Sequence, residues 1–322
     1  MAIVFIGTPA FAVPALQRLV AGGYEVSAVF TQPDRPAGRG RTRKAPAIKA
    51  AAEELGLPVH QPDSLKASAV LDQLRALDPD VIVGVAYGQL IPAPVLAMAP
   101  RGVLNVHPSL LPRWRGASPV AAAIVAGDEE TGVTIMLMDE GLDSGPILSQ
   151  VARTISPGDT AGTLTEALAE EGADLLADTL PRWLAGEIEP RSQDASRATS
   201  CRRLRKADGR IDWRQTATEV WRHVRAYNPW PGAHSHLDGE AMSFWRAWPL
   251  GAESGEPPGT VIAAAPDLPA EAEGAAFAVQ TGHGTLAVLE AQRAGKRALA
   301  SADLLRGMPD LIGRRFSTRE SR

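Results

Sequence analysis

Several features that define whole classes of proteins are missing from this sequence of 322 residues. It has one cysteine, Cys201, and six histidines spread along the chain, which excludes an internal disulfide and a zinc cluster of Cys and His ligands. We therefore expect a reducing, cytoplasmic setting and no bound metal. Because there is no run of about 18 apolar residues and no basic start of a signal peptide, we also expect no membrane span.

Two phosphate-binding motifs are also absent. The first apolar run is followed by Gly7-Thr-Pro-Ala-Phe-Ala, and not by the G-x-G-x-x-G of a dinucleotide-binding turn. No G-x-x-x-x-G-K-[ST] loop occurs either, which argues against a dehydrogenase and against a P-loop NTPase. The 33 basic and 37 acidic residues give a net charge of −4, so any contact with a polyanion must come from a local patch.

The first half of the chain alternates short apolar runs with helical patterns, which predicts βαβ units and a mostly parallel, Rossmann-like sheet. A long helix is expected over residues 161–185, and we place the end of this α/β domain at residue 186. The expected strands cover residues 2–6, 24–31, 59–61, 81–86, 102–107, 132–138 and 146–153.

The rest of the chain changes in character after residue 186. Residues 187–207 have no sustained apolar period and are interpreted as a surface linker. Residues 208–322 combine a helix at 216–227 with short runs of β type separated by Gly and Pro, which predicts a small, OB-like β-barrel domain. Five of the seven tryptophans fall here, and we expect them to form the core of that domain, the alternative being a platform on which bases stack: residues 213, 221, 230, 245 and 248.

The segment Asn105-Val-His107-Pro108 contains the best candidates for chemistry. With a period of two, Asn105 and His107 point to the same side of a strand that Pro108 ends. Ligands bind at that carboxyl edge of an open α/β sheet. A carboxamide beside an imidazole can stabilise an oxyanion and move a proton, although a capping asparagine and a structural histidine would give the same pattern.

Two motifs near this pair resemble those of the folate-dependent formyltransferases. Ser109-Leu-Leu-Pro-x-x-x-Gly-x-x-Pro follows Asn-x-His directly, and Met138-Asp-Glu-Gly-Leu-Asp143-Ser-Gly-Pro lies further on, with Asp143 placed 36 residues after His107. The resemblance implies that Asn105, His107 and Asp143 form the catalytic trio. Asn105 would be the oxyanion donor and His107 the proton-transfer group, while Asp143 would orient the imidazole and favour its protonated form.

Further similarity covers almost the whole chain and implies both substrates. Segments that resemble the members acting on initiator tRNA are 5–12, 32–41, 85–92, 228–232 and 294–296. The implied donor is 10-formyltetrahydrofolate, and the implied acceptor is the α-amine of methionine esterified to initiator tRNA. The residues expected to meet the folate, unless they serve packing alone, are Tyr87, Gln89, Leu90, Ile91, Ser109, Leu110, Leu111 and Pro112.

A basic segment offers a place for the tRNA. Residues 33–49 contain six cations and a single acid, Asp34. Such a run is often only a solvated loop, but it follows a strand whose carboxyl end faces the expected site, and it can bind phosphates of an acceptor stem. The expected tRNA-binding residues are Arg35, Arg39, Arg41, Arg43 and Lys44, with Lys206 and Lys296 extending the track into the second domain.

Other readings remain open from the sequence. The same trio would serve formylation of glycinamide ribonucleotide or of a nucleotide-linked amino sugar, and water in place of the amine would give a formyltetrahydrofolate hydrolase. A tRNA-binding protein without catalysis is the alternative from another class. We expect a monomer.

Overall fold

The computed structural model describes residues 1–37 and 42–317. These residues form two compact units, which are described separately. The first unit comprises Met1–Pro119, Glu130–Thr154 and Leu164–Cys201, and the second comprises Val120–Glu129, Ile155–Thr163 and Arg202–Arg322. Among the described residues, no helix has both the length and the apolarity needed to cross a bilayer.

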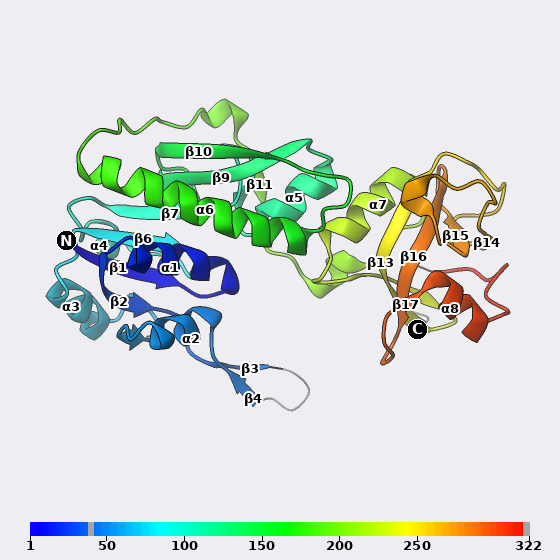
Figure 1. The fold of residues 1–322 in the computed structure, drawn as a ribbon, viewed down its shortest axis with the longest axis horizontal. Coiled ribbons are helices and arrows are strands. Elements are labelled where there is room, and N and C mark those ends of the chain that lie inside the picture. The colour runs from blue at the N-terminus through cyan, green and yellow to red at the C-terminus, as the bar shows by residue number, and fades with distance from the viewer. Residues whose placement is uncertain (38–41, 318–322) are drawn as a thin grey trace. The chain divides into compact units, whose positions relative to one another are not determined.

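The first unit is built on a seven-stranded sheet with the order β10-β9-β7-β6-β1-β2-β5. The five strands from β7 to β5 are mutually parallel, whereas β9 runs antiparallel to both β7 and β10, which confirms the mostly parallel α/β prediction (Figure 1). The strands are β1 (Ala2–Gly7), β2 (Glu25–Phe30), β5 (Val59–His60), β6 (Val81–Val85), β7 (Val103–His107), β9 (Glu130–Leu137) and β10 (Ile147–Thr154).

Helices cover the two faces of this sheet. On one face, α3 and α4 pack with alternate strand residues such as Val4, Ile82 and Val103. On the other, a Cβ added to Gly172 of α6 would lie 2.8 Å from Val106, so this glycine lets the long helix approach β7. The helices are α1 (Val13–Ala21), α2 (Ala47–Glu54), α3 (Ser68–Ala76), α4 (Ala93–Leu96), α5 (Pro119–Ala126) and α6 (Ala161–Leu184), the last two extending into ranges of the second unit.

Two short strand pairs lie outside this sheet. Arg35–Ala37 (β3) and Thr42–Lys44 (β4) form an antiparallel hairpin that extends away from β2 and α2 in Figure 1. Arg115–Gly116 (β8) pairs in parallel with Ser200–Cys201 (β11), and the paired residues are 85 positions apart in the sequence. The sequence predicted neither pair, because each strand has only two or three residues and no period to read.

The second unit contains an antiparallel sheet with the order β12-β13-β16-β15-β14, and β17 pairs with β16. Residues 313–317 bond to both outer strands: Ser317 exchanges two backbone hydrogen bonds with His236 of β12, and Val261 of β14 bonds to Gly313 and Arg314. This closure confirms the OB-like prediction. The elements are α7 (Ala217–Ala226), β12 (Ala233–Leu237), β13 (Glu240–Leu250), β14 (Val261–Ala263), β15 (Phe277–Gln280), β16 (Thr285–Arg293), β17 (Leu299–Ala300) and α8 (Ser301–Gly307).

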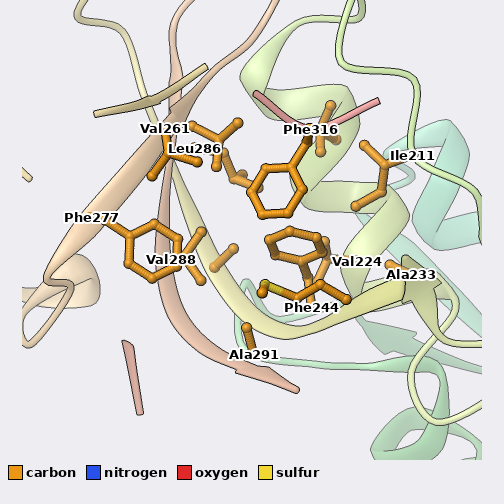
Figure 2. Close-up of a cluster of buried hydrophobic side chains, with 14 of the residues drawn as sticks. Ile211, Val224, Ala233, Phe244, Val261, Phe277, Leu286, Val288, Ala291 and Phe316 are labelled. Carbon is orange, nitrogen blue, oxygen red and sulfur yellow. The ribbon is translucent and has the colours of Figure 1, made fainter. Parts of the chain in front are cut away.

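Phenylalanines, more than tryptophans, fill the core of this unit. Figure 2 shows Phe244, Phe277 and Phe316 among the aliphatic side chains of the strands and of α7. Trp213 is buried and contacts two of these rings, but Trp230 is 56% exposed, so the expectation that all five tryptophans form the core is wrong. Trp230 lies between two prolines in a loop, where it belongs to no strand or helix that could bury it.

Candidate active site

The carboxyl end of β7 presents the two residues expected to carry chemistry. Val106 faces α6, and the alternation of the strand places Asn105 and His107 together on the opposite face. His107 is 4% exposed, and its Nε2 lies 3.1 Å from the carbonyl oxygen of Trp114. The carboxamide of Asn105 is half-buried and makes no hydrogen bond to any residue that the structure describes, so it is available to a ligand.

Asp143 approaches from the loop between β9 and β10. Its Oδ2 lies 3.8 Å from Nδ1 of His107 and accepts a 2.8 Å hydrogen bond from the backbone N–H of Gly116. The backbone of Asp143 is in the left-handed region, with φ of 49°, a conformation that aspartate tolerates better than most residues. The structure thus brings the carboxylate to the imidazole across 36 residues of sequence.

The surroundings of His107 determine which form of its ring is present. A carbonyl oxygen only accepts, so the contact with Trp114 places the proton of the neutral ring on Nε2 and leaves the lone pair of Nδ1 facing Asp143. Burial lowers the pKa of His107, and the negative charge of Asp143 raises it by less, so the net pKa is below the usual value. Asp143 favours the protonated form as expected, but burial outweighs it.

The signature residues 109–112 form a turn tied to β9 and β10. Thr134 Oγ1 donates to the carbonyl of Ser109 at 2.6 Å and accepts from the N–H of Leu111 at 3.1 Å. Gln150 Nε2 donates to Thr134 Oγ1 and to the carbonyl of Leu111. Ser109 and Leu111 are buried, whereas Leu110 and Pro112 are half-buried, so the latter two are the members of this group with surface left for a ligand.

The segment 87–91 follows β6, the neighbour of β7. The carbonyl of Tyr87 accepts from Thr8 Oγ1 and from Gln32 Nε2, both at 2.9 Å, and its ring is buried in a hydrophobic cluster with Phe30. The backbone N–H groups of residues 88–91 have no acceptor among the described residues, and Leu90 is 76% exposed. The side chain of Gln89 donates to the carbonyl of Asp63, and that of Ile91 packs on the same cluster.

The basic residues lie in both units. Arg43 and Lys44 are exposed on β4, and Arg35 of β3 donates to the side chain of Gln32. Lys49 is paired with Asp34 at 3.2 Å, which helps to hold the pKa of that carboxyl below its usual value, after the larger effect of a hydrogen bond from Gln61. Arg39 and Arg41 lie outside the described residues. In the second unit, Lys206 and Lys296 are exposed.

Three residues that the sequence did not mark support the site: Gln193, Thr199 and Cys201. All come from the segment interpreted as a linker. Thr199 Oγ1 accepts from the N–H of Trp114 at 2.9 Å, and the Cys201 thiol donates to the carbonyl of Arg115 at 3.3 Å. Burial raises the pKa of this thiol. No local period or motif could have revealed these contacts, because they join segments about 85 residues apart.

The described part of the chain contains no group of three or more His, Cys, Asp and Glu side chains placed to hold a metal ion. The site is instead a carboxamide, a buried neutral imidazole and a carboxylate in a row at the edge of a sheet. That arrangement can stabilise an oxyanion, accept a proton and stabilise the resulting imidazolium.

Comparison with known proteins adds to this geometry. Residues 1–180 match the family model described as formyl transferase, and residues 203–309 match that of the formyl transferase C-terminal domain. The chain is 47% identical over 308 residues to a methionyl-tRNA formyltransferase of Chloroflexus aurantiacus, covering 96% of this chain and 97% of the relative. A methionyl-tRNA formyltransferase of Methylococcus capsulatus is 44% identical over 318 residues, covering 99% of this chain and all (100%) of the relative.

Solved structures share the fold at lower identity. HypX from Aquifex aeolicus in complex with tetrahydrofolic acid has a TM-score of 0.62 and 20% identity, covering 94% of this chain and 46% of HypX. The methionyl-tRNA formyltransferase from Clostridium thermocellum has a TM-score of 0.55 and 16% identity, covering 80% of this chain and 95% of that one.

Proposed function

The chain belongs to the formyl transferase family, and from this premise we propose that it formylates the α-amine of methionine carried by initiator tRNA. The formyl donor in this proposal is 10-formyltetrahydrofolate. The product, formylmethionyl-tRNA, serves the start of translation. The enzyme acts in the cytoplasm as a monomer and needs no metal.

The free carboxamide of Asn105, next to the buried pair of His107 and Asp143, carries the proposal. The neutral amine attacks the formyl carbon, which forms a C–N bond and an oxyanion, and Asn105 Nδ2 donates a hydrogen bond to that oxyanion. His107 Nδ1 takes the proton that the amine loses, and Asp143 at 3.8 Å stabilises the imidazolium. The intermediate then collapses: the bond from carbon to the folate nitrogen breaks, and His107 returns the proton to that nitrogen.

The folate is proposed to lie along the segment 87–91. The backbone N–H groups of residues 88–91, which have no acceptor among the described residues, suit the polar edge of a pterin ring. The exposed side chains of Leu90 and Leu142 offer apolar surface for the rest of the cofactor. Tyr87, Gln89 and Ile91 support this segment through packing and through the bond of Gln89 to Asp63, and Ser109 to Pro112 form the neighbouring wall.

The tRNA is proposed to contact cations of both units. Residues 1–186 carry the side chains that react, and residues 208–322 supply affinity for the tRNA, with 187–207 between them. In the first unit the contacts are Arg35, Arg39, Arg41, Arg43 and Lys44, and in the second they are Lys206 and Lys296. Arg43 and Lys44 support this proposal because they are exposed on β4, and because Asp34, the single acid of residues 33–49, is engaged by Lys49.

The test is a formylation assay with purified protein, 10-formyltetrahydrofolate and methionyl initiator tRNA. Uncharged initiator tRNA and methionyl elongator tRNA are the controls, and both formylmethionine and released tetrahydrofolate are measured. We expect formylation of the charged initiator alone. Tetrahydrofolate released without formylmethionine would overturn the acceptor and point to hydrolysis, and formylation of an amino sugar nucleotide in preference to tRNA would point to another amine.

A further inference from the structure

Gln193 connects the two loops that build the site. Its Nε2 donates to the backbone carbonyls of Asp143 at 2.9 Å and Gly145 at 2.7 Å. Its Oε1 accepts from Nε and Nη2 of Arg115, at 3.0 and 2.8 Å. Both polar atoms of this one amide are therefore engaged, and their partners lie on the Asp143 loop and on β8.

We propose that Gln193 is a positioning residue that fixes Asp143 against His107, so that the segment 191–201 forms part of the catalytic apparatus. The proposal deepens the formyl transfer proposed above and rests on it. Gln193 does not touch the reacting atoms, because its bonds to the Asp143 loop are to backbone carbonyls. Its action passes through the carboxylate of Asp143.

The chemistry of an amide is what this position requires. Only a side chain that donates at one end and accepts at the other can join two carbonyl oxygens to a guanidinium. Backbone contacts also fix the segment that follows Gln193 against residues 112–116. Strand β11 pairs with β8, and the carbonyl of Pro112 accepts from the N–H of Thr199 at 3.2 Å. A glutamine on an unanchored segment would leave the Asp143 loop free to move. Here the segment of Gln193 and the strand of Arg115 are themselves held together by backbone hydrogen bonds.

Displacing Asp143 should change the rate and the protonation of His107 together. A misplacement of about 1 Å at a catalytic group can cost about 10²-fold in rate. The charged and titratable groups that face His107 and Asp143 are these two residues, the Cys201 thiol and, through Gln193, Arg115. Burial raises the pKa of the thiol and arginine keeps its charge throughout, so the acid limb of the pH profile is assigned to His107, whose pKa burial lowers below its usual value.

The experiment compares Gln193→Ala and Gln193→Glu with the wild type. We expect Gln193→Ala to lower kcat by about 10- to 100-fold with little change in KM for either substrate, and to move the acid limb of the pH profile to lower pH. Gln193→Glu keeps an acceptor for Arg115 but cannot donate to the two carbonyls. It also adds a negative charge near Asp143, so it should lower kcat and move the acid limb to higher pH.

A matched control and a second readout separate this inference from the proposed function. Gln73→Ala removes an exposed glutamine whose amide hydrogen-bonds to His60 and to no other described residue, and it should leave kcat and the pH profile unchanged. The pKa of His107, followed by NMR, should fall in Gln193→Ala whichever amine is the true acceptor. Gln193→Ala added to Asp143→Asn should cost little further rate, because both act through one carboxylate.

Two outcomes would overturn the inference. One is a Gln193→Ala enzyme with the wild-type kcat and the wild-type pKa of His107. The other is a loss of kcat that adds in full to that of Asp143→Asn, because it would mean that Gln193 acts by another route. A wild-type enzyme that fails to formylate methionyl-tRNA would instead overturn the proposed function, and the NMR comparison would still decide the role of Gln193. Arg115→Lys, which keeps a cation but loses the two-pronged contact, provides a milder variant should Gln193→Ala fold poorly.

Discussion

Asn105 and His107 lie two residues apart on β7, and their different hydrogen bonding separates their roles. His107 has its Nε2 bonded to Trp114 and its Nδ1 directed at Asp143, whereas the carboxamide of Asn105 makes no hydrogen bond to any of the described residues. A polar group that a bound substrate covers loses its water, and this is costly unless the substrate supplies a hydrogen-bond partner. Asn105 is therefore the residue from which binding and chemistry can gain most.

The sequence indicated these residues as candidates but could not predict the balance of their electrostatics. The motifs around Asn105, His107 and Asp143 suggested the trio, and alternation along the strand placed the first two side by side. The pKa of His107, however, depends on how far its ring is buried, and burial arises from segments such as 109–116 and 199–201 that fold over it. Long-range packing of this kind has no local signature in a sequence.

Replacing Asn105 by alanine removes the proposed oxyanion donor. We expect kcat for formyl transfer to fall by about 10²- to 10³-fold, with KM for the folate and the tRNA changed little, because the bond is strongest in the transition state. The measurement is steady-state kinetics together with a melting curve. Near-normal kcat in a folded Asn105→Ala enzyme would remove this residue from the mechanism.

Replacing Asp143 by asparagine tests the proton path. Activity requires neutral His107, so kcat/KM falls at acid pH as the ring becomes protonated. The charge of Asp143 raises the pKa of His107, and its removal must lower that pKa further. We expect the acid limb of kcat/KM in Asp143→Asn to move to lower pH, with kcat reduced by about 10²-fold or more because the imidazolium loses its carboxylate. An acid limb that moves to higher pH would contradict this assignment.

At the scale of elements, the sequence predicts helices and strands that have an apolar period, but it does not predict short strands whose partners are far away in the sequence. The apolar periods located the long helix at 161–185, against the observed Ala161–Leu184, and placed β7 and β10 to within one residue. The pairing of β8 with β11 was missed because two residues carry no period and their partners are distant in the sequence. The connection between β7 and β9 left strand direction open, and only the structure shows that β9 is antiparallel.

Replacing Gly116 by alanine tests whether the β8–β11 pair supports catalysis. The φ of 111° at Gly116 disfavours any side chain, and a Cβ there would lie 2.2 Å from the carbonyl oxygen of Cys201. We expect Gly116→Ala to lower the free energy of unfolding by about 1–3 kcal/mol and to reduce kcat, because the N–H of Gly116 holds Asp143. Urea unfolding and kinetics measure both effects.

The control for this substitution is Gly251→Ala, because a Cβ at Gly251 would meet no atom within 4 Å. It should change the urea midpoint and kcat little. A Gly116→Ala enzyme as stable and as active as this control would show that the β8–β11 pair has no part in holding Asp143.

At the scale of the whole molecule, a chain with a net charge of −4 must bind a polyanion through local patches, and the patches proposed here lie in both units. Each contact between a cation and a phosphate releases counterions, so the logarithm of tRNA affinity falls linearly with the logarithm of salt concentration. Removing one such contact lowers the slope by about 0.7–0.9. Two patches that contact the same tRNA should contribute to the slope independently.

Neutralising the two patches separately and together tests whether both units hold one tRNA. We expect Arg43→Ala with Lys44→Ala, and separately Lys206→Ala with Lys296→Ala, each to raise KM for the tRNA and to flatten its salt dependence, with KM for the folate unchanged. In the fourfold variant the two losses of slope should add. Lys66→Ala with Arg101→Ala removes two exposed cations outside the patches and should leave both quantities unchanged. If only the first pair alters the slope, the second unit does not contribute electrostatically to binding, and its proposed role in affinity is wrong.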